Sequence, residues 1–584
     1  MQFKNNDPYC AIKKTIALPR RSARARAENR IDKKPSKKLS KKPVKTANPQ
    51  LKVWLQTRKK ILQQIKNRVA EHLDREPKEL VAYRREYERN FHKKFQLSDI
   101  SELEKQIKNS QVVFGGDFHA FSQAQRMHLK IMRRYPADQE VTIALESTSP
   151  KQNEIVESYL NLKISEKNFL KKMQWSETWG FPWENYRPIF ELARDRKYRI
   201  IGLSEHFEGE TESLRARDKL AAQILVREIK RNPKRKIYVL FGDLHIADKH
   251  LPKEFSDQCE KLGVKAASLS IMLNSESIYF KLAEKRLENK IEIVKLSQSQ
   301  FCVMGSPPWV QWQSYLMYLE RSTDQMLLDE DPEFDPTDEV RALVELVCSD
   351  LKIQMPANDL AVYSSYDEKL WRALRKQVEK KDFKLLDELI EDGRSLCFSQ
   401  SGICYLARPS VNHVAELAGQ YLHAKLSKRK KFYWDLPNDF EKQIWCEALS
   451  FFISKLINHK RYSQSLLDLS QKLRENATAS EQEILKLALD HRMGEVLFLH
   501  QMKKHKRRFK PRRKTSYLFA ARILGSMMGE RLYIALQSNK IKLGEIVRFL
   551  KFDPQRTDFL DFYLKILRWL EPVHLELKSR KERL

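Results

Sequence analysis

Two short patterns of chemically capable residues stand out in this sequence, because both read Gly-Asp-x-His and both follow an apolar run. One covers residues 116–119 and the other covers residues 242–245. Their reactive side chains are Asp117, His119, Asp243 and His245. A neutral imidazole is the commonest nitrogen ligand of transition metals, and an imidazole beside a carboxylate can serve as a general base. The glycine lets the chain turn sharply and lets a ligand approach the backbone, so the repeated pattern predicts one shared site.

The elements that must position these motifs alternate between strand and helix patterns. The predicted strands are the apolar runs at 111–116, 140–145, 198–203, 236–242 and 265–273. The stretches between them have helical periodicity. Two further runs, 276–282 and 290–296, are expected to add antiparallel edge strands. The alternation predicts an α/β fold with a mostly parallel sheet covered by helices.

Ionisable residues directly follow several of these strands. Glu146 follows the second predicted strand, and Glu205 and His206 follow the third. Because the carboxyl ends of parallel strands meet at one edge of a sheet, we expect His119, Glu146 and His245 to lie close enough to share a ligand. Two imidazoles and a carboxylate suit a divalent transition metal with open coordination positions. Without a metal the same set can act as a base–carboxylate pair, and a lone histidine after a strand is often only structural.

Composition divides the chain into five segments. The first is rich in Lys and Arg and poor in apolar residues, so it cannot bury a core and is expected to be disordered. The predicted segments are a basic disordered tail (1–50), a helical extension (51–110), the α/β domain (111–305), a linker (306–340) and a mostly α-helical region (341–584). Within the last segment, residues 396–410 predict a β-hairpin and residues 503–514 are nearly all basic.

The charge balance of the chain is strongly basic. It has 109 Lys and Arg residues against 77 Asp and Glu residues, a formal net charge of +32. This excess favours nucleic acid or an anionic surface as a partner, contacted through residues 1–50 and 503–514. The seven cysteines are scattered without a CxxC pair, which indicates reduced thiols. No signal peptide, lipoprotein anchor or transmembrane segment is visible, so a cytoplasmic location is expected.

Residues 111 to about 300 resemble the Tiki/ChaN/erythromycin-esterase superfamily, and most closely its ChaN-like haem-binding uptake branch. The resemblance rests on the two GxxH motifs, here 116–119 and 242–245, and on Glu146 after the second strand. The stretch WGFPWENYRPIFELARDRKYRIIGLS, residues 179–204, is similar to the ChaN signature. The stretch RARDKLAAQI, residues 215–224, is similar to a charged helix start at which an Arg or Asp faces the site. The resemblance implies duplicated βα units whose two motifs face each other across one site.

This resemblance implies that the domain binds haem or a divalent transition metal. His119, Glu146 and His245 are the expected metal ligands. Haem iron also accepts a tyrosine, so Tyr186 is a candidate ligand. An aromatic face would come from Trp179 and Trp183, and Asp117 and Asp243 complete the expected cofactor site.

Two alternatives remain open at this stage, and with them the question whether the protein is an enzyme. The Tiki and erythromycin-esterase branches imply a metal-dependent hydrolase. In that case a metal or His119 activates water, Glu146 and His245 assist, and Arg215 or Arg217 stabilises an oxyanion. No GxSxG nucleophile motif is visible. The second alternative is a basic scaffold that binds polyanions and retains the site only as a relic.

Overall fold

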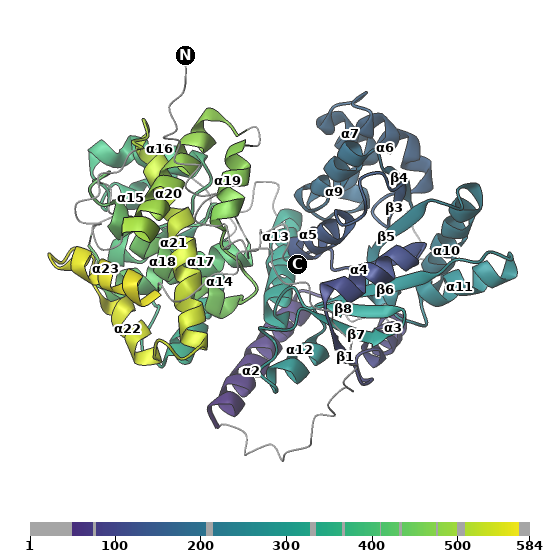
Figure 1. The fold of residues 1–584 in the computed structure, drawn as a ribbon, viewed down its shortest axis with the longest axis horizontal. Coiled ribbons are helices and arrows are strands. Elements are labelled where there is room, and N and C mark those ends of the chain that lie inside the picture. Colours follow the sequence, from purple (N-terminus) through teal and green to yellow (C-terminus); the bar gives the residue numbers. More distant parts are fainter. Residues whose placement is uncertain are drawn as a thin grey trace, which may run out of the picture. The chain divides into compact units, whose positions relative to one another are not determined.

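An eight-stranded sheet organises residues 96–303 in this computed structural model (Figure 1). Its strands lie in the order β1-β7-β8-β6-β2-β5-β3-β4. The structure describes residues 49–73, 78–205, 214–327, 335–364, 368–408, 410–430, 435–474, 477–498 and 509–570. Residues 1–48 of the basic tail and residues 503–508 of the basic run therefore lie outside the described residues.

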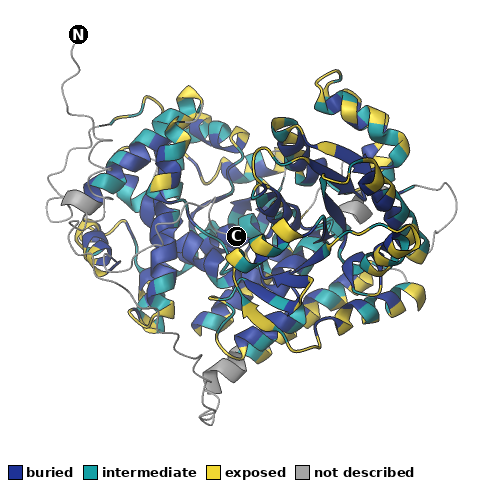
Figure 2. Ribbon diagram, turned by 45° about the vertical axis from the view of Figure 1, so that its right-hand side comes forward, coloured by how far each residue is buried: buried dark blue, intermediate teal, exposed yellow. Residues whose placement is uncertain are grey.

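The sheet is mostly parallel, as the sequence predicts. Neighbouring strands from β8 through β6, β2, β5 and β3 to β4 are all parallel, whereas β7 and β1 add antiparallel pairs at one side. The central strands β2 and β3 are buried along their whole length, and Figure 2 shows most strands of the sheet in the colour of buried residues. The strand bounds are β1 Gln96–Ser98, β2 Val112–Asp117, β3 Val141–Leu145, β4 Arg199–Gly202, β5 Lys236–Gly242, β6 Ser268–Leu273, β7 Ile293–Ser297 and β8 Gln300–Val303.

Helices connect the parallel strands and complete the α/β fold. Their bounds are α5 Ser122–Met132, α6 Asn153–Leu160, α7 Glu166–Met173, α8 Trp175–Thr178, α9 Trp183–Arg196, α10 Leu214–Arg231, α11 Leu251–Lys261 and α12 Glu276–Ala283. The expected edge strand at 276–282 is wrong, because this run forms α12. Ser275 caps that helix by accepting a hydrogen bond from the Ile278 amide, and Ile278 and Leu282 bury the same helical face. The run at 290–296 does contain an antiparallel strand, β7.

The segment 51–110 is mostly helical, as expected, and comprises α2 Pro49–Glu71, α3 Lys78–Arg89 and α4 Ile100–Asn109. The sequence did not suggest the edge strand β1, which lies between α3 and α4. The segment 306–340, expected to be a linker, mostly forms α13 Pro308–Leu327 and the start of α14 Thr337–Leu351. The physical reason is burial, since Trp309, Val310, Leu316 and Met317 all pack into the core. Residues 50–584 form one compact unit, so the domain boundaries inside it remain predictions.

The region after α13 is mostly helical, which confirms the sequence-based expectation. Its further helices are α15 Glu368–Leu374, α16 Phe383–Glu391, α17 Val411–Leu426, α18 Phe440–Ile457, α19 Leu466–Arg474, α20 Ala479–Phe498, α21 Lys514–Gln537, α22 Leu543–Lys551 and α23 Phe559–Leu570. Helix α18 is buried nearly all round and packs against α17 and α21. Gly525 permits the close approach of α21, since a Cβ there would lie 2.8 Å from the Ala448 nitrogen of α18.

A small sheet interrupts the helical region. The predicted hairpin is present, because β10 Leu396–Cys397 pairs antiparallel with β11 Ile403–Tyr405. A third strand that the sequence did not suggest, β9 Ala361–Tyr363, pairs parallel with β11. The six cysteines that the structure describes are free thiols. In the described part of the chain, no helix combines the length and apolar character needed to cross a membrane.

Candidate functional site

The two Gly-Asp-x-His motifs lie at the carboxyl edge of the sheet, on neighbouring strands. Strands β2 and β5 are parallel, and their register places Asp117 opposite Gly242. His119 follows β2 in a loop, and His245 lies in the short 3₁₀ helix η2, Asp243–Ile246, that begins directly after β5. Strand β3 flanks β5 on the other side and ends one residue before Glu146. Parallel neighbours therefore deliver all three predicted side chains to one edge.

Gly242 marks the point at which these side chains meet. A Cβ at this position would lie 3.4 Å from His119 Nε2, 3.3 Å from Glu146 Oε2 and 3.4 Å from His245 Cδ2. His119 Nε2 itself lies 3.5 Å from Glu146 Oε2. The Gly242 amide donates a hydrogen bond of 2.5 Å to Glu146 Oε2. The expected clustering is thus present, whereas the roles of these residues stay predictions.

A carboxylate and a tyrosine hold the inner nitrogen of His119. Its Nδ1 lies 3.0 Å from Oδ2 of Asp117, which is 2% exposed. The hydroxyl of Tyr186 donates to the same carboxylate oxygen at 2.7 Å and lies 3.3 Å from Nδ1. Gln125 donates to the other carboxylate oxygen at 2.5 Å. The contacts at Nδ1 therefore fix the orientation of the His119 ring, and its Nε2 faces Glu146.

His245 is held in the same manner by residues from other elements. Its Nδ1 lies 2.7 Å from Oδ1 of Asp218 on α10. The hydroxyl of Tyr83 on α3 donates to the other oxygen of Asp218 and lies 2.9 Å from Nδ1. A carboxylate at Nδ1 favours the proton on that nitrogen and leaves the lone pair on Nε2. Both imidazoles therefore have the second-sphere support that is typical of ligating histidines.

The pKa values of Glu146 and His119 shift in opposite directions in this buried setting. Burial raises the pKa of Glu146, but the charges of Arg217, His119 and His245 outweigh it and lower that pKa below the usual value. Arg217 also forms an ion pair with Glu146 directly. Burial lowers the pKa of His119, but its hydrogen bond to Asp117 and the surrounding carboxylates outweigh burial and raise that pKa.

Asp243, in the second motif, differs from Asp117 in its surroundings. Burial raises the pKa of Asp243 to about 6, and the charge of Asp117 adds to this effect while that of His119 opposes it. The hydroxyl of Tyr87 on α3 lies 3.5 Å from Asp243 Oδ2. The two motifs therefore have the same sequence pattern but different contacts. Asp117 contacts the histidine of its own motif, His119, whereas His245 is contacted by Asp218 and not by Asp243.

A cavity of about 810 Å³ opens beside these groups. It is lined by His119, Glu146, His245, Arg217, Asp117 and Asp243. Aromatic side chains form much of its remaining wall, namely Tyr87, Phe91, Phe118, Phe181, Phe280, Trp312 and Tyr315. Further cations also line it, namely Lys59, Lys66, Arg84 and Lys281. The site therefore combines polar side chains at its centre with an aromatic and cationic surround.

Several residues predicted for the site lie elsewhere. Trp183 does not line the cavity and instead packs among Trp175, Phe169 and Phe190, with ring centroids about 5 Å apart. Tyr186 is 1% exposed and contacts the site only through Asp117 and His119. Burial raises the pKa of the Tyr186 phenol well above its usual value. Its role as an iron ligand stays a prediction.

Some of the remaining candidate residues lie at the site and others do not. Arg215 donates to Glu86 and to the Lys249 carbonyl, each at 2.6 Å, so Arg217 alone of the two arginines reaches Glu146. Trp179 stays near the site, with its ring 4.6 Å from the His119 ring. Glu205 does not line the cavity, and His206 lies outside the described residues.

Sequence reasoning missed the contribution of α3. Tyr83 and Tyr87 stand four residues apart on this otherwise charged helix, so they share one face, and both are buried against the site. His250 stacks on Tyr83 with ring centroids 3.5 Å apart. The four-residue spacing of the two tyrosines indicates that they share a buried face of α3. The sequence does not indicate which part of the protein packs against that face.

Comparison with known proteins bears on the part of the chain that holds the first motif. Residues 103–207 match the protein family described as haem-binding uptake, Tiki superfamily, ChaN. The predicted resemblance is confirmed for this ChaN-like segment. A solved structure described as cofacial haem binding to ChaN of Campylobacter jejuni is 12% identical, covers 30% of this chain and 87% of that chain, and has a TM-score of 0.23. Among curated proteins, none matches this chain.

Proposed function

We propose that the cavity at the carboxyl edge of the sheet binds haem, with His119 and His245 as the candidate axial ligands. The observation that carries this proposal is the matched support of the two imidazoles. Each has its Nδ1 held by a carboxylate and a tyrosine, and each lines the cavity. The match of residues 103–207 to the ChaN family supports the same ligand.

The donor set fits haem better than a bare divalent ion. In the part of the chain that the structure describes, no group of three or more His, Cys, Asp or Glu side chains is arranged to hold a metal ion. A catalytic zinc site uses three protein ligands. Haem iron is already held by its macrocycle and takes only one or two axial ligands from the protein. A single well-oriented imidazole is therefore sufficient.

The wall of the cavity fits the rest of such a ligand. Phe118 lies edge-on to Trp312 and to Tyr315, with ring centroids 6.3 and 5.6 Å apart. Aromatic faces of this kind bind a flat apolar macrocycle. Lys66 lies 5.0 Å from the Trp312 ring and pairs with Glu276 at 2.5 Å. Cations at the edge of the aromatic wall are suited to the propionate groups of haem.

Haem titration of the purified full chain tests this proposal. We expect a Soret band and saturable binding for the wild type. His119→Ala and His245→Ala should shift the band or weaken binding, since each removes one candidate iron ligand. His72→Ala is the matched control, because His72 lies on the surface next to Glu320 and does not line the cavity. Binding that is absent in the wild type, or equal in all four proteins, contradicts the proposal.

A second candidate is a hydrolase of the Tiki or erythromycin-esterase type. The specific observation in its favour is the Asp117–His119 pair, which has the geometry of an oriented general base beside the Arg217–Glu146 ion pair. In that case an activated ester should be hydrolysed by haem-free protein. The activity should fall at least a hundredfold in His119→Ala and should be unaffected by His72→Ala.

A further inference from the structure

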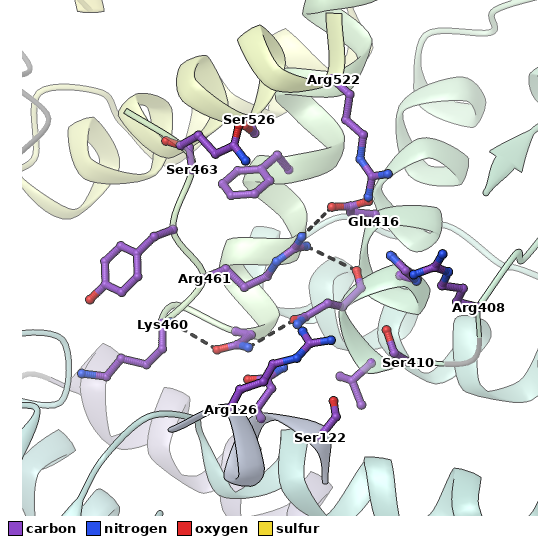
Figure 3. A pocket seen from close by; sticks show the side chains of 18 of the residues that line it. Ser122, Arg126, Arg408, Ser410, Glu416, Lys460, Arg461, Ser463, Arg522 and Ser526 are labelled. Carbon is purple, nitrogen blue, oxygen red and sulfur yellow. Dashed lines mark hydrogen bonds and ion pairs between the residues drawn. The ribbon is translucent and has the colours of Figure 1, made fainter. Parts of the chain in front are cut away.

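A second cavity, of about 870 Å³, lies among α5, α17, α19, α21 and the segment that follows α18 (Figure 3). Its charged lining is unbalanced. Seven Lys and Arg side chains line it against three glutamates, and no aspartate does. The cations come from separate elements, so the fold rather than one basic stretch of sequence gathers them. This cavity and the predicted haem site have one lining residue in common, Asn274, and none of the charged residues.

The centre of this cavity has two guanidinium groups on one carboxylate. Arg461 donates to one oxygen of Glu416 at 2.6 Å, and Arg522 donates to the other at 2.7 Å. Figure 3 shows both arginines reaching the same glutamate. Burial raises the pKa of Glu416, but the two arginines outweigh it and lower that pKa to about 2. One carboxylate balances one of the two positive charges, so a partly buried positive charge remains.

The other two glutamates reduce this excess but do not remove it, since seven cations face three carboxylates in all. Glu447 is committed to Arg394, which does not line the cavity, at 2.5 Å. Glu481 accepts hydrogen bonds from the amide and hydroxyl of Thr478, both at 2.9 Å. The positive potential of the cavity is therefore not cancelled by its own acidic residues.

Cations surround the opening as well. Arg126 and Lys130 extend from α5, and Arg408 extends from the loop after β11. Arg126 and Arg408 are exposed, and Figure 3 shows them on different sides of the space that Arg461 enters. Helix α17 begins at this cavity, and its N-cap residue Ser410 forms no side-chain capping bond, so the amide dipoles of its first turn add to the positive potential.

We infer that this cavity binds a small organic polyphosphate. The lining has four more cations than carboxylates, which matches a triphosphate group, whose charge is roughly four negative near neutral pH. Arginine forks suit phosphate oxygens because they bind them in a bidentate manner. Phe121 and Phe451 also line the space and are nearly buried, so the organic part of such a ligand has an apolar wall. This inference does not depend on the haem proposal.

Isothermal titration of the full chain with three probes tests the inference. Magnesium-free ATP and inorganic tripolyphosphate should bind, whereas adenosine should not. The double variant Arg126→Gln/Arg408→Gln should weaken both polyphosphates at least about tenfold, because two charge-assisted contacts are lost. Both arginines are exposed, so this variant should keep the wild-type melting temperature and haem titration. Arg372→Gln is the control, since Arg372 is an exposed arginine outside the cavity that pairs with Glu368.

Failure of both polyphosphates to bind the wild type overturns the inference, and so does unchanged affinity in the double variant. A single-stranded RNA that binds far more tightly than ATP, and loses that affinity in the same variant, also overturns it in favour of nucleic acid.

Discussion

Glu416→Gln should destabilise the protein by about 3 kcal/mol at pH 7. The pKa of this carboxyl is lowered from an ordinary 4.5 to about 2, with burial opposing and the charges of Arg461 and Arg522 producing the decrease. Each pKa unit is worth about 1.36 kcal/mol, so the ionised form of Glu416 contributes about 3 kcal/mol to folding. Glutamine keeps the shape of the side chain but leaves two neighbouring guanidinium groups without their shared carboxylate.

The pH dependence follows from the direction of this change. A carboxyl with a lowered pKa in the folded state contributes stability fully above about pH 4.5, and this contribution is lost as the pH falls through about 2. At pH 3 the charge-dependent difference between wild type and variant should be about 1 kcal/mol. Urea unfolding followed by circular dichroism at pH 7, 4 and 3 measures both values.

Glu368→Gln is the matched control for this experiment. Glu368 forms an exposed pair with Arg372 one helical turn away, and its side chain is 75% exposed. Pairs of this kind contribute under about 0.5 kcal/mol, so this variant should unfold like the wild type at every pH. The reasoning is refuted if Glu416→Gln stays within about 0.5 kcal/mol of the wild type at pH 7. A difference of constant size from pH 7 to pH 3 also refutes it.

Three further substitutions test the site and the fold. Asp218→Asn should weaken haem binding about 10- to 100-fold, because it removes the charged acceptor that holds His245 Nδ1. A Soret titration measures the affinity, with Asp248→Asn as the control because Asp248 does not line the cavity. Equal haem affinities of the two variants would contradict this prediction. Gly202→Ala should destabilise the fold by about 1–3 kcal/mol, because a Cβ there collides with backbone atoms of a neighbouring loop. Gly544→Ala should stabilise the fold by up to about 1 kcal/mol, because Gly544 lies in helix α22 and no atom lies within 4 Å of the added Cβ. Equal melting temperatures of the Gly202→Ala and Gly544→Ala variants would contradict both expectations.

The α/β core could be predicted from the sequence because its signals are local. Each buried parallel strand is a nearly continuous apolar run, as in residues 236–242. In each connecting helix the apolar residues recur every three or four positions, which is the spacing of one helical face. The run at 276–282 is ambiguous in the sequence, because a short apolar stretch is compatible with both strand and helix. A capping serine before it decides for the helix. The sequence does not separate α13 from a linker, because the neighbouring stretch 327–340 is rich in proline and acidic residues.

The meeting of His119, Glu146 and His245 is predictable from the sequence, because residues that follow parallel neighbouring strands share one edge of the sheet. The residues that hold the two imidazoles in place depend on packing between distant elements. Asp218 and Tyr83 reach His245 from α10 and α3, 27 and 162 residues away along the chain. The second cavity has the same origin, since its cations come from helices and loops far apart in sequence. Periodicity reports which face of a helix is buried, but the partner of that face is set by packing over the whole chain.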